Sequence, residues 1–214
     1  MITIFSVANE PYLGYLKTLH ASIKRYLPNS KFIGFLVDCK KDDYDFDARH
    51  IKSDEKIPVN NFCAGLRTRL FVDLLEEINT PLLYIDADSI FVNEADSLIE
   101  HINSCGVSMR PKNLDEGTFA SGVIACNPNK LINNFFQNYK KNYLDVLYLG
   151  DWFSDQKMLN KTYQEMKGKI NFKPLPNKFC DVWFSEEGII WTAKGRTRNS
   201  QKFINKLEEY NYVR

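Results

Sequence analysis

The sequence predicts a single α/β domain in which a mixed, mainly parallel central sheet is flanked by helices. Residues 2–7 are rich in β-branched side chains and alternate in pattern, which is typical of a strand. Leucine and isoleucine then recur at helical spacing over 13–27, and a second apolar strand is expected over 32–37. A strand, a helix and a strand in this order form a parallel unit, and such units bind ligands at the carboxyl ends of their strands.

Strands and helices continue to alternate along the rest of the chain. A loop rich in Lys and Asp over 39–59, with one short strand near 48–51, leads into a helix from Asn60. The run over 82–85 is apolar throughout, so we expect a strand that is buried on both faces. After it the sequence predicts helices over 95–102, 128–143, 156–166 and 200–210, strands over 106–109, 122–125, 170–172 and 188–191, and a loop over 150–155.

Composition and charge exclude several classes of function. The 28 Lys and Arg residues nearly balance the 27 Asp and Glu residues, and no basic stripe carries interleaved aromatic residues, so nucleic acid is not an expected partner. No apolar run reaches the ~18 residues of a membrane-spanning helix, so we expect no transmembrane segment. The five cysteines are odd in number and lack paired metal-binding spacing, which favours reduced thiols in a cytoplasmic protein.

Two carboxylates, Asp86 and Asp88, follow the apolar strand directly and are separated only by Ala87. At the edge of a sheet, this D-x-D turn can chelate a hard divalent cation and leave coordination positions open for other oxygens. Without such a cation, single charges on a carboxylate and a diphosphate ~4 Å apart would repel by about 4 kcal/mol. The turn therefore predicts a site for Mg²⁺ or Mn²⁺ with a diphosphate, although two solvated surface acids would produce the same pattern.

The segment around this turn, Tyr84 to Val92, resembles the Y-h-D-x-D strand and turn of glycosyltransferases with the A-type nucleotide-sugar fold. It is most similar to the retaining group that includes glycogenin and bacterial lipopolysaccharide galactosyltransferases. Further motifs follow in the order and spacing of this family and cover nearly the whole chain. The resemblance implies one Rossmann-like nucleotide-sugar transferase domain over 1–214, with a nucleotide-binding half over 1–92 and a donor-sugar and acceptor half over 93–214.

The nucleotide pocket that the resemblance implies comes from the first half of the chain. Its base and ribose contacts are Ala8, Asn9, Tyr12, Ser22 and Asp38. The T-R-L segment on the helix before the D-x-D strand resembles an A-R-L element whose arginine reaches the nucleotide-sugar, which assigns Arg69. That side chain lies off the apolar stripe of its helix, as either a ligand contact or a solvated arginine would. Arg67 lies nearer the apolar side, where it either snorkels or makes the true ligand contact.

Two motifs in the second half resemble the segments that line the donor sugar. The first, F-A-S-G-V-I-A-C-N, is similar to F-N-[SA]-G-V-h-h-h-N and assigns Ser121 and Gly122 to the site, while Ala120 replaces the asparagine common in the family. The second, D-Q-K-M-L-N, is similar to D-Q-x-x-h-N, which implies Asp155 and Gln156 near the anomeric carbon. Asp155 could equally cap the helix that it precedes.

The segment T-A-K-G-R-T-R near the end resembles H-x-x-G-x-x-K, whose histidine is a third metal ligand and whose lysine meets the diphosphate. Thr192 replaces the histidine and Arg198 replaces the lysine. Arg198 can still bind phosphate bidentately, and the same segment places Lys194 and Gly195 at the donor. Thr192 is a poor metal ligand and no histidine lies near a motif, so the D-x-D turn and water are the only metal ligands that the sequence names.

Together the motifs predict a metal-dependent glycosyltransferase. Such an enzyme moves a sugar from a nucleotide-diphosphate sugar, most often UDP-linked in similar enzymes, to a hydroxyl group of a glycan, a lipid-linked molecule or a protein. The resemblance implies retention of configuration. Asp155 and Gln156 would orient the sugar, while Mn²⁺ or Mg²⁺ on the D-x-D turn would stabilise the leaving diphosphate.

The main alternative is a phosphatase of the haloacid-dehalogenase type. The apolar strand and D-x-D turn nearly match its first motif, with Asp86 as nucleophile and Asp88 as general acid, and the G-D-x-x-x-D run over 150–155 resembles its metal motif. Against it, Ile90 stands where the phosphatases have Thr or Val, and the strand that opens their domain begins only at Leu82. A nucleotidyltransferase would need a Gly-rich opening loop that this sequence lacks, whereas a non-catalytic binding module would share the same cleft.

Overall fold

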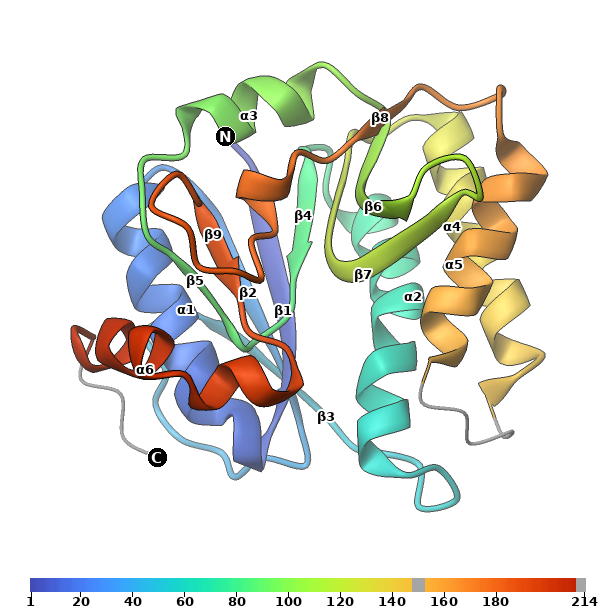
Figure 1. Ribbon diagram of the computed structural model, residues 1–214. Coiled ribbons are helices and arrows are strands. Elements are labelled where there is room, and N and C mark those ends of the chain that lie inside the picture. Colours follow the sequence, from blue (N-terminus) through green and yellow to red (C-terminus); the bar gives the residue numbers. More distant parts are fainter. Residues whose placement is uncertain (148–152, 211–214) are drawn as a thin grey trace.

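The computed structural model describes residues 1–147 and 153–210, and Figure 1 shows them as a central sheet with helices packed on both faces. The main sheet has seven strands in the spatial order β3-β2-β1-β4-β7-β6-β8. Strands β3, β2, β1 and β4 are parallel, whereas β7 runs antiparallel to both β4 and β6. The sheet is therefore mixed and mainly parallel, as predicted. Its strands are β1 (Thr3–Asn9), β2 (Lys31–Val37), β3 (Asp47–Ile51), β4 (Leu82–Ile85), β6 (Val107–Asn113), β7 (Thr118–Cys126) and β8 (Phe172–Pro174).

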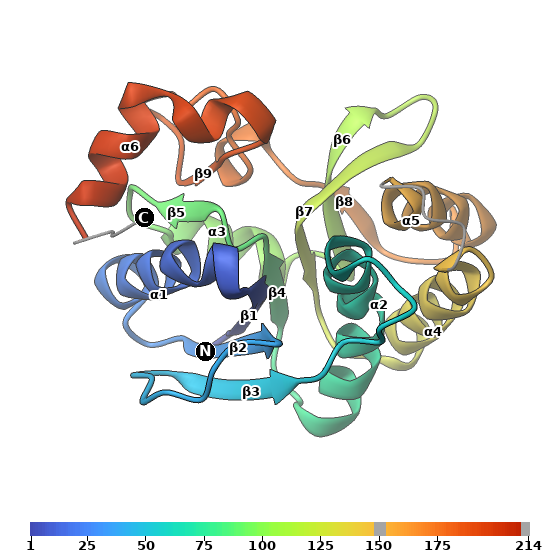
Figure 2. The same ribbon diagram turned by 90° about the horizontal axis from the view of Figure 1, so that it is seen from below.

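Helices bury a separate apolar cluster on each face of this sheet. In Figure 2, α1 lies on one side of the strands, and α2, α4 and α5 lie on the other. Side chains of β1 alternate between the faces: Phe5 and Val7 belong to the cluster under α2, whereas Ile4 belongs to the cluster under α1. The helices are α1 (Leu13–Tyr26), α2 (Val59–Glu77), α3 (Asp96–Asn103), α4 (Lys130–Leu144), α5 (Ser154–Met166) and α6 (Gln201–Glu208).

A second, two-stranded sheet brings the C-terminal segment back to the end of β4. Strand β5 (Ser89–Phe91) pairs antiparallel with β9 (Ile190–Thr192), and the short helical turn η4 (Gly195–Asn199) and α6 follow β9. A third apolar cluster, which includes Trp191 and Phe203, holds this ribbon and α6 together. The N–H of Ala193 donates to the carbonyl of Asp88 at 2.9 Å, so segments distant in the sequence meet at the D-x-D turn.

The structure confirms most of the expected elements and shifts the bounds of several, among them the strand expected over 188–191, which begins at Ile190. The strands expected over 106–109 and 122–125 extend into a long hairpin, because pairing continues as far as Asn113 and Thr118. The strand expected over 170–172 begins only at Phe172, and β5 had no separate signal in the sequence. The expected loop over 150–155 starts outside the described residues, and α5 begins earlier than predicted, at Ser154.

Helix α2 is buried around most of its circumference rather than along one stripe. It lies between the sheet on one side and α4 and α5 on the other, so its buried positions extend beyond the predicted apolar stripe. This burial decides which polar residues of α2 can face the site. The buried residues of this helix are Asn61, Gly65, Leu66, Arg67, Thr68, Leu70, Phe71, Val72, Leu74 and Leu75.

The structure shows the state of the five cysteines and the surroundings of two of the three histidines. All five cysteines are free thiols. His20 stacks on Phe32, and the ring of His101 shares a 2.7 Å hydrogen bond with Ser108, so both histidines are part of the packing. No helix within residues 1–147 and 153–210 is long and apolar enough to cross a membrane.

The contact between α2 and α4 predicts the effect of adding one methyl group. A Cβ atom at Gly65 would lie 2.1 Å from the ring of Tyr143, so Gly65→Ala should lower the free energy of unfolding by about 1–2 kcal/mol. With Tyr143→Leu in place, the same substitution should become neutral or stabilising, because only the helix propensity of alanine remains. Urea unfolding of the wild type, the two single variants and the double variant measures these changes in the free energy of unfolding. An equal effect of Gly65→Ala with and without Tyr143→Leu would contradict the prediction.

Candidate active site

Asp86 lies at the point where β4 ends and three parts of the chain meet. Its N–H donates to the carbonyl of Gly122 in β7 at 2.8 Å, which fixes the turn against the neighbouring strand. Its carboxylate accepts a hydrogen bond from Tyr84 Oη at 2.8 Å. The same carboxylate lies 3.4 Å from Arg67 Nη1 and 3.4 Å from Lys194 Nζ, so two basic side chains share it.

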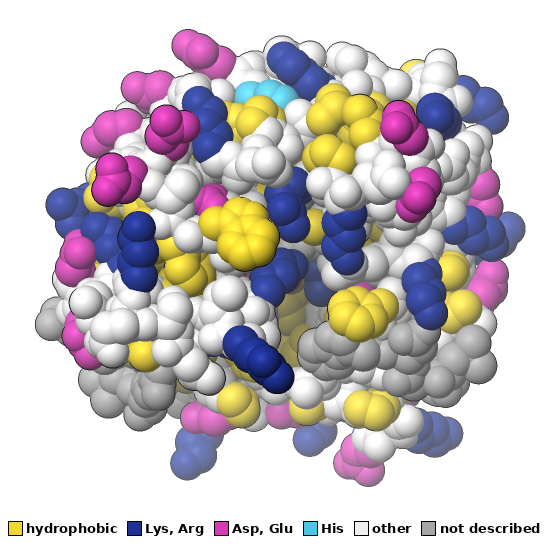
Figure 3. All heavy atoms as spheres, in the orientation of Figure 1, with side chains coloured by type: hydrophobic (Ala, Val, Ile, Leu, Met, Phe, Trp, Pro, Cys, Tyr) yellow, Lys and Arg dark blue, Asp and Glu magenta, His cyan; other side chains and the backbone are white. Residues whose placement is uncertain are grey.

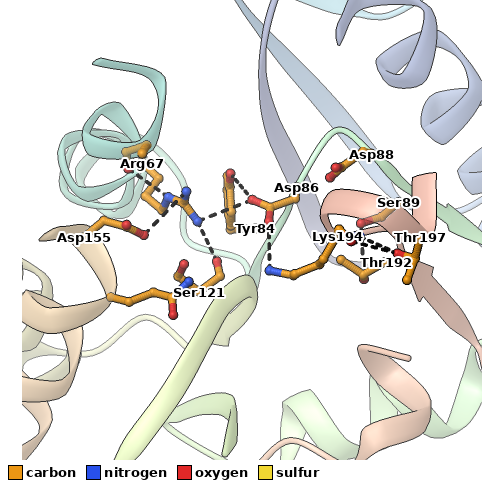
Figure 4. A network of polar contacts seen from close by, with 12 residues as sticks. Arg67, Tyr84, Asp86, Asp88, Ser89, Ser121, Asp155, Thr192, Lys194 and Thr197 are labelled. Atoms are coloured by element: carbon orange, nitrogen blue, oxygen red, sulfur yellow. Dashed lines mark hydrogen bonds and ion pairs between the residues drawn. The ribbon is translucent and has the colours of Figure 1, made fainter. Parts of the chain in front are cut away.

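Arg67 of α2 is the buried centre of the polar network in Figure 4. It is only 7% exposed, and its Nη1 donates to the carbonyl of Ser121 at 2.7 Å. Its guanidinium lies between the carboxylates of Asp86, at 3.4 Å, and Asp155, at 3.6 Å, and over the ring of Tyr84. A buried arginine is tolerated only when it is paired, so Arg67 ties the D-x-D turn, β7 and α5 to one another.

Asp88 and Arg198 form the second ion pair of the D-x-D turn. Asp88 is 6% exposed, and its Oδ2 accepts a hydrogen bond from Arg198 Nε at 2.7 Å. The guanidinium of Arg198 also lies 5.2 Å from the centre of the Tyr12 ring, a cation–π contact. Arg198 thus joins the end of the chain to the loop that follows β1.

The environments of the two carboxylates move their pKa values in opposite directions. Burial alone would raise the pKa of Asp86, but the positive charges of Lys194 and Arg67 and the hydrogen bond from Tyr84 hold it below its ordinary value. Burial and the nearby charge of Asp86 raise the pKa of Asp88 to about 6, against the opposing effect of Arg198. Asp86 is therefore the firmly ionised member of the pair.

Two cavities open on either side of these ion pairs and meet at Arg67, Asp86, Asp88 and Arg198. They span about 600 and 880 Å³ when the open solvent at their mouths is included. The first lies over the ends of β1 and β4 and is further lined by Val7, Ala8, Asn9, Tyr12, Asn60, Cys63, Ala64, Tyr84 and Ala87. The second lies over β7 and α5 and is further lined by Ala64, Ser121, Phe153, Asp155, Gln156, Ala193, Lys194 and Gly195.

The two cavities are lined by most of the site residues that the sequence analysis predicted. Gly122 stands directly behind them, beside Asp86 and Lys194. Asp155 is buried in the first turn of α5 and does not cap that helix, whose cap position is Phe153. The predicted residues that line the cavities are Ala8, Asn9, Tyr12, Asp86, Ala87, Asp88, Ser121, Asp155, Gln156, Lys194, Gly195 and Arg198.

Three predicted contacts lie elsewhere. Ser22 is buried inside α1, where its Oγ accepts a hydrogen bond from the N–H of Phe91 at 3.0 Å, so it supports β5. Asp38 follows β2 but accepts hydrogen bonds from Ser53 and lines neither cavity. The reason in both cases is that a sequence motif fixes the element but not the direction of a side chain.

Arg69 is the third predicted contact that lies away from the two cavities. Its side chain is 67% exposed, pairs with Asp73 at 3.2 Å and faces a separate groove beside β3. Arg67, two residues earlier, occupies the site instead. The available signal was the charge of Arg67 on the apolar side of the helix, because a charged residue at a buried position needs a partner.

The polar network also includes residues that no motif indicated. Lys112, at the end of β6, donates to Gln156 Oε1 at 2.5 Å. Burial and the nearby positive charges of Lys194 and Arg110 lower the pKa of Lys112, which shows that basic groups crowd this side of the cleft. Asn60, Cys63 and Ala64 reach the first cavity from the start of α2. The sequence did not identify them as site residues, because small or uncharged side chains are common in helices of any function.

The side chains at the turn do not fit a resident divalent cation. Thr192, at the position of the family's histidine, is fully buried and its Oγ1 accepts a 3.2 Å hydrogen bond from Ser89. Within residues 1–147 and 153–210, no group of three His, Cys, Asp or Glu side chains could hold a metal ion. The Asp86 and Asp88 carboxylates are already paired with basic side chains, which a cation would have to displace.

Comparison with known proteins places the fold. No family model and no curated protein matches the sequence. The galactosyltransferase LgtC, solved with donor and acceptor sugar analogs, superposes with a TM-score of 0.68 at 13% identity, over 100% of this chain and 98% of LgtC. An active-site mutant of LgtC, in which glutamine is replaced by glutamate, superposes with a TM-score of 0.63 at 12% identity. This match covers 99% of this chain and 95% of the LgtC chain.

The glycosyltransferase GlyE of Streptococcus pneumoniae TIGR4 superposes with a TM-score of 0.67 at 13% identity. The match covers 99% of this chain and 60% of GlyE, so the chain spans about three fifths of the length of that protein. This chain shares the fold of these glycosyltransferases. At such low identity the likeness concerns the fold, and the chemistry has to be argued from the site itself.

The raised pKa of Asp88 predicts that its ionised carboxylate lowers the free energy of unfolding. Its folded pKa of about 6 exceeds the ordinary 3.8, so the free energy of unfolding falls as the pH rises between these values. In metal-free buffer, Asp88→Asn should therefore raise the free energy of unfolding by roughly 1–3 kcal/mol at pH 8 and have little effect at pH 4.

Asp86→Asn is the matched control, because the pKa of Asp86 is lowered and its ionised form stabilises the fold. This variant should be less stable than the wild type at pH 8. Chemical denaturation at both pH values measures the two effects. A shift in the same direction for both variants at pH 8 would contradict the assignment.

Proposed function

We propose that this protein is a glycosyltransferase that moves a sugar from a nucleotide-diphosphate sugar to an acceptor hydroxyl group. One observation carries the proposal: the D-x-D turn, with Lys194 and Arg198 on its two carboxylates, lies where the two cavities meet at the carboxyl edge of the sheet. Parallel α/β sheets bind ligands at this edge. Basic groups at such a junction suit a diphosphate, which links a nucleoside on one side to a sugar on the other.

The first cavity suits the nucleoside, which we propose is uridine. The small side chains of Ala8 and Ala87 leave space in it for a ligand, and Tyr12 supplies an aromatic ring. Asn9 is 8% exposed and offers an amide that can both donate and accept hydrogen bonds. Most of this cavity comes from 1–92, which we assign as the nucleotide-binding half.

The second cavity suits the donor sugar and the acceptor, and 93–214 supply most of it. Asp155 Oδ2 is buried and receives no hydrogen bond from the described part of the chain, so it can accept one from a sugar hydroxyl. Gln156 lies on the same turn of α5, where Lys112 orients its amide. A glutamine is also an active-site residue of LgtC, which supports a role for Gln156 at the sugar.

The transfer follows from this arrangement. The acceptor oxygen forms a bond to the anomeric carbon while the bond from that carbon to the diphosphate breaks. The diphosphate keeps the bonding electrons and takes up the acceptor proton. Lys194 and Arg198 lie where its negative charge grows, which stabilises the transition state more than the bound donor. We propose retention of configuration, as the motif resemblance implies, and an acceptor that is a glycan, a lipid-linked molecule or a protein.

The phosphatase alternative receives less support from these residues. Its nucleophile, Asp86, would have to attack phosphorus while its carboxylate is held by Tyr84, Arg67 and Lys194. The Gly150 and Asp151 pair of its second motif lies outside the described residues. LgtC and GlyE, which superpose on 100% and 99% of this chain, are glycosyltransferases.

Thermal melting with a panel of UDP-, GDP- and ADP-linked sugars tests the proposed function. At least one nucleotide-sugar should raise the melting temperature of the wild type and be consumed with release of its nucleoside diphosphate. Beryllium fluoride, which mimics an aspartyl phosphate, should have no effect. Stabilisation by beryllium fluoride alone would favour the phosphatase.

Two arginines on the same helix provide a matched pair of variants. Arg67→Lys should lower kcat/KM for the donor by about tenfold or more, because lysine cannot bridge Asp86, Asp155 and Ser121. Arg69→Lys should change it by less than about twofold, since Arg69 faces a groove on the far side of α2. Release of nucleoside diphosphate measures both, with circular dichroism to confirm folding. Equal losses of kcat/KM in the two variants would show that Arg67 has no specific role at the site.

A further inference from the structure

We propose that Lys194 and Arg198 supply the positive charge that the sequence assigns to a divalent cation, so that the nucleoside diphosphate binds at the D-x-D turn without a metal. This inference rests on the proposed function, because it concerns how the same site holds the diphosphate of a nucleotide-sugar. It departs from the sequence prediction of Mn²⁺ or Mg²⁺ on Asp86 and Asp88.

Each carboxylate of the turn already has a basic partner. Lys194 Nζ lies 3.4 Å from Asp86 Oδ2, and Arg198 Nε donates to Asp88 Oδ2 at 2.7 Å. Both partners come from one short segment after β9, so both charges reach the turn together. A chelated cation would compete with them for the same oxygens and would be repelled by both.

The backbone of β7 leaves space for the Lys194 contact. At Gly122, a Cβ atom would lie 2.6 Å from Asp86 Oδ2 and 2.6 Å from Lys194 Nζ. Any side chain at this position would push the carboxylate and the ammonium group apart. The absence of a side chain at Gly122 is therefore what allows the ion pair to form.

Lys194 and Arg198 keep donors for a ligand while they hold the turn. An ammonium group has three N–H donors and a guanidinium group has five. Their contacts with the carboxylates use one donor from each. The two side chains are 35% and 31% exposed and line the second cavity, so further N–H groups can reach phosphate oxygens there.

Basic side chains offset the negative charge of the carboxylates in the cleft. Figure 3 shows Lys and Arg side chains gathered around a hollow in the middle of this face. The carboxylates of Asp86, Asp88 and Asp155 line the second cavity together with three basic side chains, those of Arg67, Lys194 and Arg198. Lys112, which donates to Gln156 beside this cavity, adds a fourth positive charge.

Isothermal titration calorimetry with UDP and with inorganic pyrophosphate tests the proposal in buffers that contain either EDTA or MnCl₂. The wild type should bind in EDTA with an affinity within about threefold of that in Mn²⁺. Lys194→Gln should weaken binding in EDTA by about tenfold or more, because a charge-assisted contact is lost. Lys194→Arg, which keeps the charge, should restore most of the affinity and separates the loss of charge from a loss of folding.

Arg196→Gln is the matched control. Arg196 belongs to the same segment, is exposed and lines neither cavity, so its loss should change the affinity by less than about twofold. Binding by the wild type only in Mn²⁺, or equal losses in Lys194→Gln and Arg196→Gln, would overturn the inference and leave the glycosyltransferase function standing. No binding of UDP, pyrophosphate or any nucleotide-sugar in either buffer would overturn both.

Discussion

The buried guanidinium of Arg67 is the interaction on which the site depends. It joins the D-x-D turn after β4, the backbone of β7 and the first turn of α5, three elements that are far apart in the sequence. A buried charge without partners would destabilise the protein by several kcal/mol, so each partner of Arg67 is held in place by the others. The same contacts that stabilise the fold therefore fix the positions of Asp86 and Asp155 before any ligand arrives.

This network explains why two carboxylates in one short turn behave differently. Asp86 shares two basic partners and a tyrosine hydroxyl group, whereas Asp88 has one arginine and lies close to the charge of Asp86. The pKa of Asp88 is therefore raised while that of Asp86 is lowered. A site that keeps a destabilised carboxylate is a common compromise between stability and function.

Motifs predicted the positions of residues well where a strand fixes the direction of the backbone. Asp86 and Asp88 follow an apolar run that could only be a buried strand, so their place at the sheet edge was predictable. Arg69 shows the limit of the same reasoning. The motif match assigned this arginine to the site, but its side chain lies on the exposed side of α2. Lys112 gave no signal at all, because its role comes from the β6–β7 hairpin that carries it over α5.

The sequence by itself determined the order of elements, the mixed sheet and the segments that reach the cleft, because periodicity and apolar runs act over a few neighbouring residues. The tertiary structure alone decided which arginine of α2 is buried, that Thr192 points into the core, and that Lys194 meets Asp86 beside Gly122. These contacts join residues far apart in the chain. Their geometry depends on how whole elements pack, and a local pattern carries no information about that packing.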